Sequence, residues 1–141
     1  MLIDCDTNKS ILKQLCIDKH IVFTRYFFRH RENAKFIVNP HHQVMADTMD
    51  RVFRGEITRL IINVPPGYTK TEMAVLSFIA RGLAYNPEAK FIHTSYADSL
   101  ALQNSLTIRD IVLSQEYQKL WPLQLRKDNQ SKKSGANGRR V

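Results

Sequence analysis

The sequence predicts an α/β fold in which parallel strands are flanked by helices, following a helical N-terminal segment. Two apolar runs, residues 60–64 and 90–94, support this prediction because each has the length and composition of a buried strand. A tight loop and a helical pattern lie between the two runs. One such crossover joins parallel strands in a right-handed sense, so the sequence predicts a parallel pair.

The N-terminal third predicts helices. Residues 1–10 are polar and predict a frayed end, whereas residues 11–31 carry apolar residues at helical spacing and predict one or two helices. Residues 36–38 predict a short extended piece. The basic side chains of the N-terminal helices are either nucleic-acid contacts or an ordinary solvated face. They are Lys19, Arg25, Arg29 and Arg31.

Asn39 and Pro40 predict the start of the next helix, because Asn is a favoured N-cap and Pro a favoured first helical residue. Gly55 predicts its end. Its expected apolar stripe consists of Val44, Met45, Thr48, Met49, Val52 and Phe53.

The second half predicts helices around the second strand. The helix after the central loop runs to about Ala84, and Asn86-Pro87 makes a turn. Residues 95–98 resemble a capping box that opens another helix, and residues 116–122 form a short helix or turn. The expected inner face of the helix after residue 98 is Leu100, Ala101, Leu106, Ile108, Ile111 and Val112.

The loop between strand and helix reads PPGYTKT and ends in Lys70-Thr71. Strand, loop, Lys-Thr and helix is the layout of a phosphate-binding loop, so the fold is expected to be a partial P-loop NTPase fold. The pattern G-x-x-x-x-G-K-S/T has its glycines where this chain has Val64 and Thr69. The alternative interpretation is a plain strand-to-helix turn with an exposed lysine.

These elements divide the chain into an incomplete P-loop ATPase domain, residues 1–125, and a tail, residues 126–141. The domain has N-terminal helices in 1–35 and a nucleotide-binding core in 36–125. The tail lacks apolar periodicity and is rich in Ser, Gly, Asn and Lys, which predicts disorder. It carries +5 of the net charge of +8, which suits a polyanionic partner or simply solubility.

The cysteines and the hydropathy pattern point to the cytoplasm. Cys5 and Cys16 form no CxxC pair and have no zinc-type spacing. Nothing else suggests a secreted disulfide scaffold, so a reducing compartment is expected. The sequence shows no signal peptide and no run near the roughly 18 apolar residues of a membrane span, so no membrane partner is expected.

Several blocks together resemble the N-terminal ATPase region of the large terminase subunit of tailed bacteriophages, the motor that packages DNA. The resemblance covers roughly residues 23–131 and rests on the order and spacing of the blocks. The blocks are FIVNPHHQVMADTMDRVFRGEITRLIINVPPGYTKTE, NPEAKFIHTSYADSLALQNSLTIRDIV, YQKLWP and LRKDNQSK. Terminases commonly carry a Pro-Pro loop, which matches Pro65-Pro66-Gly67, whereas Thr69 departs from the usual small residue.

The resemblance implies a site for ATP and Mg²⁺. Its cofactor-binding residues would be Pro65, Pro66, Gly67, Tyr68, Thr69, Lys70, Thr71 and Glu72, with His42 and Gln43 flanking the adenine. Lys70 matches the phosphate lysine, and Thr71 the residue whose hydroxyl faces Mg²⁺. Ser95-Tyr96 matches a block linked to DNA contact or coupling. The implied partners are double-stranded DNA, the small terminase subunit and the portal, inside a bacterial host cell.

One part of a working motor is missing from the sequence. No apolar strand ends in paired acids, the group that would hold Mg²⁺ and activate water. The coupling motif and the nuclease domain of the family also have no match. The chain therefore resembles the first part of a truncated, prophage-like terminase without its own turnover. The alternatives are a non-catalytic nucleotide- or nucleic-acid-binding module and a non-functional remnant.

Overall fold

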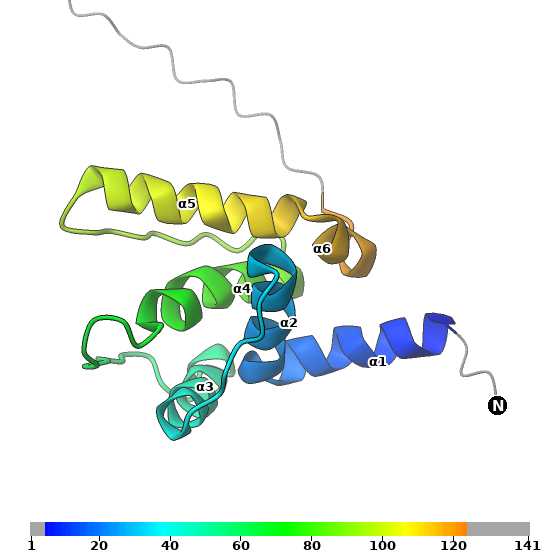
Figure 1. Ribbon diagram of the computed structural model, residues 1–141, viewed down its shortest axis with the longest axis horizontal. Helices are drawn as coiled ribbons and strands as arrows, with labels where there is room; N and C mark the ends of the chain where they lie inside the picture. Colours follow the sequence, from blue (N-terminus) through cyan, green and yellow to red (C-terminus); the bar gives the residue numbers. More distant parts are fainter. Residues whose placement is uncertain (1–4, 124–141) are drawn as a thin grey trace, which may run out of the picture.

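The computed structural model describes residues 5–123 and shows an arrangement of helices (Figure 1). The N-terminal pair is α1 (Cys5–Asp18) and α2 (His20–Glu32). After α3 (Pro40–Phe53), a long loop leads to a helix that is wide at first, η1 (Glu72–Ser77), and continues directly as α4 (Phe78–Tyr85). The last helices are α5 (Asp98–Leu113) and α6 (Gln115–Leu120). In Figure 1, α4 lies between α5 on one side and α3 on the other.

The prediction of an α/β fold, and with it a partial P-loop NTPase fold with parallel strands, is wrong. Residues 5–123 contain no β-strand. Segments 60–64 and 90–94 are extended, but they lie apart: the first lines a groove with α3, the second a groove with α4 and α5. A strand gets its backbone hydrogen bonds from a neighbouring strand, and neither segment is the other's neighbour. Ile61 is consequently 85% exposed and Ile92 94% exposed.

The predicted helices agree better with the structure than the predicted strands do. The N-terminal region forms two helices, although the first begins at Cys5 inside the stretch expected to fray. Gly55 follows α3 with a φ of 78°, a left-handed conformation that favours glycine. The capping-box prediction at residues 95–98 is wrong, because the N-cap position of α5 is Ala97 and no side chain caps it. The predicted tail, 126–141, lies outside the described residues.

The larger core cluster joins α1, α2, α4, α5 and α6. At its centre, Phe23 and Phe27 of α2 pack against Tyr117 and Trp121, with ring centroids 4.5–6.3 Å apart where they are in contact. The hydroxyl of Tyr117 donates a hydrogen bond to the carbonyl of Ala80 at 2.9 Å. This bond satisfies the only polar group of a fully buried ring and fixes α6 against α4.

The smaller core cluster places α3. Its buried residues are Phe36, Met45, Ala46, Met49 and Met73. The predicted stripe of α3 is therefore only partly right, because Val44 is 68% exposed and Ala46 takes an inner position. The predicted inner face of α5 is also partly right, since Ile108, Ile111 and Val112 are buried but Leu106 is exposed.

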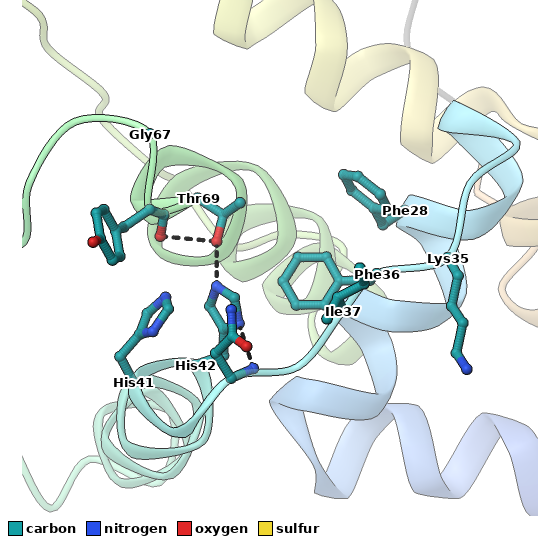
Figure 2. Close-up of a pocket in the computed structure, with 10 residues that line it drawn as sticks. Phe28, Lys35, Phe36, Ile37, His41, His42, Gly67 and Thr69 are labelled. Atoms are coloured by element: carbon teal, nitrogen blue, oxygen red, sulfur yellow. Dashed lines mark hydrogen bonds between the residues drawn. The ribbon is translucent and has the colours of Figure 1, made fainter.

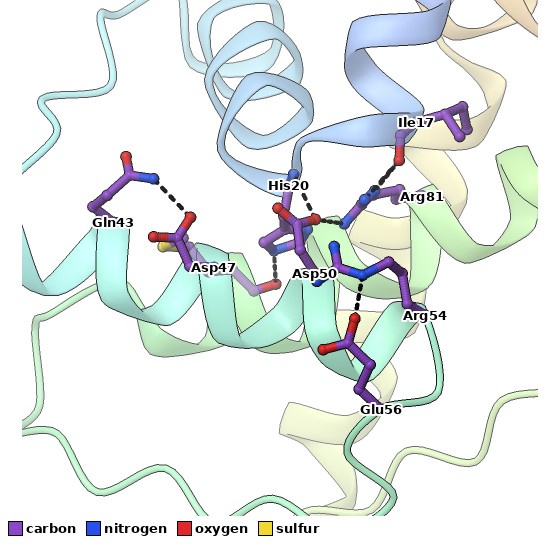
Figure 3. A network of polar contacts seen from close by, with 9 residues as sticks. Ile17, His20, Gln43, Asp47, Asp50, Arg54, Glu56 and Arg81 are labelled. Atoms are coloured by element: carbon purple, nitrogen blue, oxygen red, sulfur yellow. Dashed lines mark hydrogen bonds and ion pairs between the residues drawn. The ribbon is translucent and has the colours of Figure 1, made fainter.

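A buried polar network ties α3 to its neighbours (Figure 3). Arg81, 1% exposed, donates from Nε and Nη2 to the carbonyl of Ile17 near the end of α1. Its Nη1 lies 2.6 Å from Oδ1 of Asp50 in α3. The same oxygen accepts the backbone N–H of His20 at 3.0 Å. Burial lowers the pKa of Arg81, and the nearby Asp50 carboxylate offsets part of this effect.

His20 also accounts for the wide turns of η1. Its Nε2 donates to the carbonyl of Met73 at 2.9 Å, so that carbonyl is bonded from outside the helix. A side chain inserted in this way opens the helical ladder and favours a π-type turn. Burial and the neighbouring Arg81 lower the pKa of His20 to about 4, so its ring is neutral at pH 7.

Candidate functional site

The predicted phosphate loop, residues 65–71, joins the extended segment to a helical run that begins at residue 70. Gly67 has a φ of 85° and Thr69 a φ of 53°, while Tyr68 between them is not in the left-handed region. When the sign of φ alternates from one residue to the next, successive N–H groups point toward one spot. Such a turn is called a nest, and it binds anions. The first N–H groups of the helical run that follows lack intrahelical partners and add partial positive charge.

Thr69 occupies the position where the phosphate-loop pattern has its second glycine, and it adopts the conformation that glycine usually supplies. A β-branched residue with positive φ is strained, at a cost of roughly 1–2 kcal/mol. Strain of this kind persists only where surrounding contacts hold the residue in place.

A chain of hydrogen bonds holds Thr69 (Figure 2). The backbone N–H of Asn39 donates to Nδ1 of His42 at 3.0 Å, which makes that nitrogen an acceptor and places the ring proton on Nε2. Nε2 then donates to the Thr69 hydroxyl at 2.8 Å, and the hydroxyl donates to the carbonyl of Tyr68 at 2.8 Å. Burial and neighbouring His41 lower the pKa of His42, in agreement with a neutral ring. The start of α3 therefore fixes the conformation of the loop.

A pocket of about 350 Å³ opens between this loop and the segment that leads into α3. Phe28 and Phe36 form an aromatic wall opposite the turn at Gly67 and Thr69 (Figure 2). His41 stands at the side of the loop, with its ring 5.1 Å from that of Tyr68 in an edge-on arrangement. The pocket is lined by Phe28, Lys35, Phe36, Ile37, Asn39, His41, His42, Gly67, Tyr68 and Thr69.

Two features of the pocket fit a nucleotide. Phe28 and Phe36, packed edge-to-face, give the pocket an aromatic wall, and a planar base stacks on aromatic side chains in many binding sites. His41 also lines the pocket, and its buried Nε2 has no hydrogen-bond partner among the described residues. The nest at Gly67 and Thr69 lies at the same pocket, where a phosphate would sit.

The structure brings together some of the predicted site residues. His42, Gly67, Tyr68 and Thr69 line the pocket. Pro65, Pro66, Lys70 and Thr71 are exposed next to them in the chain, and Lys70 forms no ion pair with any described residue.

Two predicted site residues point elsewhere. Gln43 is exposed and donates to Asp47 at 2.9 Å, along α3 and away from the pocket. Glu72 is buried, and its carboxylate is paired with Arg31 of α2 at 2.5 Å. A carboxylate engaged in this way is not free to hold a metal ion or to accept a proton from water.

The residues that form the aromatic side of the pocket were not predicted as site residues from the sequence. Phe28 comes from α2, and Phe36, Ile37 and Asn39 from the segment before α3. The sequence predicted Phe28 as part of a helix, residues 36–38 as a short extended piece and Asn39 as an N-cap, and none of these as part of a pocket. Their approach to the loop depends on how α2 and α3 pack, and helical periodicity does not encode this.

Metal binding has limited support from the described residues. No three His, Cys, Asp or Glu side chains cluster there in a way that would hold a metal ion. The Thr71 hydroxyl is exposed beside the loop and offers one oxygen ligand. Mg²⁺ commonly keeps several waters and binds through substrate phosphates, so one protein ligand fits a metal that arrives with a nucleotide.

Comparison with family models, with curated proteins and with solved structures found no match to this chain. Within residues 5–123, none of the helices has both the length and the apolar character that crossing a membrane requires.

Proposed function

We propose that this chain binds a nucleoside triphosphate, with the phosphates at loop 65–71 and the base in the neighbouring pocket. The observation that carries the proposal is the alternation of φ at Gly67, Tyr68 and Thr69. Successive N–H groups in such a turn converge on an anion. The proposal does not require a β-sheet, because the nest and the start of the helix are local features of the backbone.

The side chains around the loop support a phosphate ligand. Lys70 opens the helical run, is exposed, and has no acidic partner within the described part of the chain. A lysine here adds a full positive charge to the partial charge of the backbone amides. The nearest acid, Glu72, does not oppose an anion, since Arg31 neutralises it.

The base site is assigned to Phe28, Phe36 and His41. The rings of Phe28 and Phe36 pack edge-to-face with their centroids 5.1 Å apart, which forms a rigid apolar surface. His41 adds an imidazole ring beside that surface, and its buried Nε2 has no hydrogen-bond partner among the described residues. By the resemblance the nucleotide is ATP, although Gln43 takes no part in binding the adenine.

Binding is proposed without turnover. ATP brings Mg²⁺, which neutralises phosphate charge when bound, and Thr71 would contribute its hydroxyl to the ion. Hydrolysis also needs a group that orients water. The acid nearest to the loop in the sequence is Glu72, and its ion pair with Arg31 occupies it.

By the resemblance, this site belongs to the N-terminal part of a phage-type terminase large subunit, which powers DNA translocation in the whole motor. Double-stranded DNA, the small terminase subunit and the portal are its proposed partners, in the cytoplasm of a bacterial host. The net charge of +5 carried by residues 126–141 independently supports the proposal that the chain binds DNA. Such a segment binds duplex DNA through counterion release, without sequence preference. A non-catalytic nucleotide-binding module is the second candidate function, and it requires only the loop and the pocket.

The test is calorimetric titration of the full chain with ATP and Mg²⁺, with phosphate release followed in parallel. Lys70→Ala should weaken binding about tenfold or more, because a hydrogen bond to a charged group contributes roughly 1.5–3 kcal/mol. Lys90→Ala is the matched control, since Lys90 is also exposed and belongs to the other extended segment. Separate titrations with tripolyphosphate and with adenosine measure how much of the affinity comes from the loop and how much from the pocket.

Equal affinity of the wild type and Lys70→Ala for tripolyphosphate would refute the phosphate site. Adenosine that binds no better to the wild type than to Phe36→Ala would refute the base site. Steady phosphate release that Lys70→Ala abolishes would contradict binding without turnover.

A further inference from the structure

Segment 60–64 has the features of a β-strand but no strand beside it. Residues 57–68 make no backbone–backbone hydrogen bond within the described part of the chain. The sequence Leu60-Ile61-Ile62-Asn63-Val64 is rich in β-branched residues, which favour strands. An extended apolar segment with free N–H and C=O groups is a template for pairing with another chain.

The side chains of this segment already alternate as in a strand. Ile62 packs against the smaller core cluster and Val64 is half-buried, whereas Ile61 and Asn63 are exposed. The period of two means that a pairing strand would place one set of its side chains on the α3 side and the other set toward solvent.

A groove on the α3 side has room for the side chains of a pairing strand that point toward α3. It has a volume of about 400 Å³ and runs between α3 and the segment. Val44 of α3 lines it and is 68% exposed, and Met45 forms its floor toward the core. The groove is lined by His41, Val44, Met45, Thr48, Leu60, Ile61, Ile62, Asn63 and Val64.

We propose that segment 60–64 of one copy pairs antiparallel with segment 60–64 of a second copy, across a two-fold axis. A second copy brings an extended segment with the same free backbone groups and the same apolar alternation. Antiparallel pairing about a two-fold axis satisfies both copies equally, as an isologous interface requires. The even-numbered side chains of both strands then lie on the α3 face and cover Val44.

The other extended segment, 90–94, is less suited to pairing because its side chains anchor it to the helices. The ring of Phe91 lies over Gly82 of α4, so close that a β-carbon at Gly82 would be 2.4 Å from the ring. His93 is hydrogen-bonded to Asn104 of α5 at 3.0 Å. Ile92 is nevertheless 94% exposed, which makes it a matched control for Ile61 at 85%.

The pairing should be weak. Five residues on each side form a contact well below the roughly 1,200–2,000 Å² of a stable interface. A dimer in the micromolar range is therefore expected, in exchange with monomer.

The test is sedimentation equilibrium of the full chain over roughly 1–300 μM, a span that brackets the micromolar affinities of weak complexes, together with residue-resolved hydrogen exchange. Ile61→Lys should weaken dimerisation several-fold, because it replaces an apolar cross-strand contact on both sides of the two-fold axis and places two like charges diagonally across the strand pair. Val44→Lys should do the same by placing a charge in the groove, and Ile92→Lys should leave the dimer unchanged. Every second amide of residues 60–64 should become protected as the concentration rises, because only alternate N–H groups of a strand face its partner, while the amides of 90–94 should not change.

Three results would each overturn the proposal. A chain that stays monomeric throughout this range has no such interface. A dimer that survives both Ile61→Lys and Val44→Lys uses another surface. Equal weakening by Ile61→Lys and Ile92→Lys would mean that association follows general exposed hydrophobicity. A circular dichroism spectrum that matches the wild type shows that a variant is folded, so loss of the dimer is then a loss of contact.

Discussion

Replacing Thr69 tests whether α3 holds the proposed phosphate loop in its strained conformation. Thr69→Ala removes the hydroxyl that accepts from His42 Nε2 at 2.8 Å but keeps a β-carbon at a φ of 53°. Thr69→Ser keeps the hydroxyl. Thr69→Gly removes the hydroxyl and, with it, the steric cost of the left-handed conformation. The three variants therefore separate the hydrogen bond from the strain.

The structure sets the size of each effect on the free energy of unfolding. The His42 ring is only 4% exposed, so Thr69→Ala leaves a buried N–H donor without a partner, at a cost of about 1–3 kcal/mol. Thr69→Ser should stay within about 0.5 kcal/mol of the wild type. Thr69→Gly should be about 1 kcal/mol more stable than Thr69→Ala, because relief of left-handed strain outweighs the entropy that glycine gains in the unfolded chain.

Urea unfolding followed by the fluorescence of Trp121 measures these differences, since Trp121 is the only tryptophan and is buried in the larger core cluster. ATP titration of the same variants should give the same order, with Thr69→Ala binding more weakly than Thr69→Ser. If Thr69→Ala and Thr69→Ser unfold at the same urea concentration, the bond to His42 contributes nothing. The loop would then be held by something other than the start of α3.

Two further predictions concern the buried polar network. His20 is neutral in the fold with a pKa of about 4 but protonates near pH 6.5 when unfolded, so its contribution is complete above pH 6.5 and falls as the pH drops toward 4. Between pH 6.5 and 5 the free energy of unfolding should fall by roughly 2 kcal/mol because of His20. Urea unfolding of the wild type and of His20→Gln measures this difference. If His20→Gln loses stability in acid as steeply as the wild type, the prediction is contradicted. Asp50→Ala should lower the free energy of unfolding by about 3–5 kcal/mol, because Arg81 stays buried without its partner. A double variant, Asp50→Leu with Arg81→Met, should recover most of this loss. A loss below about 1 kcal/mol for Asp50→Ala would show that the ion pair is not needed.

Helices and their ends were readable from local sequence because a helix satisfies its backbone within its own segment. Asn39-Pro40 and Gly55 marked the start and end of α3 correctly, and Asn86-Pro87 marked the end of α4. The faces of the helices were less predictable. Val44 and Leu106 fit an apolar stripe by spacing and are nevertheless exposed, because no other element covers them within residues 5–123.

The loop was predictable in part. Pro65, Pro66 and Gly67 marked the end of the apolar run and the start of a loop, which the structure confirms, whereas the prediction that this loop binds phosphate stays a prediction. Thr69 departs from the motif, because the pattern has glycine there. It nonetheless adopts the left-handed conformation, since His42, 27 residues earlier in the chain, donates a hydrogen bond to its hydroxyl. A contact between segments so far apart is not visible in the residues of the loop.

The amino-acid sequence alone determined where helices begin and end, where the loop lies, and which segments prefer an extended backbone. Those properties depend on residues within a few positions of one another. Tertiary structure decided that segments 60–64 and 90–94 form no sheet within the described residues, that Glu72 is paired with Arg31, and that Phe28 and Phe36 face the loop. Strand pairing, ion pairs and pockets need partners from distant parts of the chain, and only the packing of the helices brings such partners together or keeps them apart.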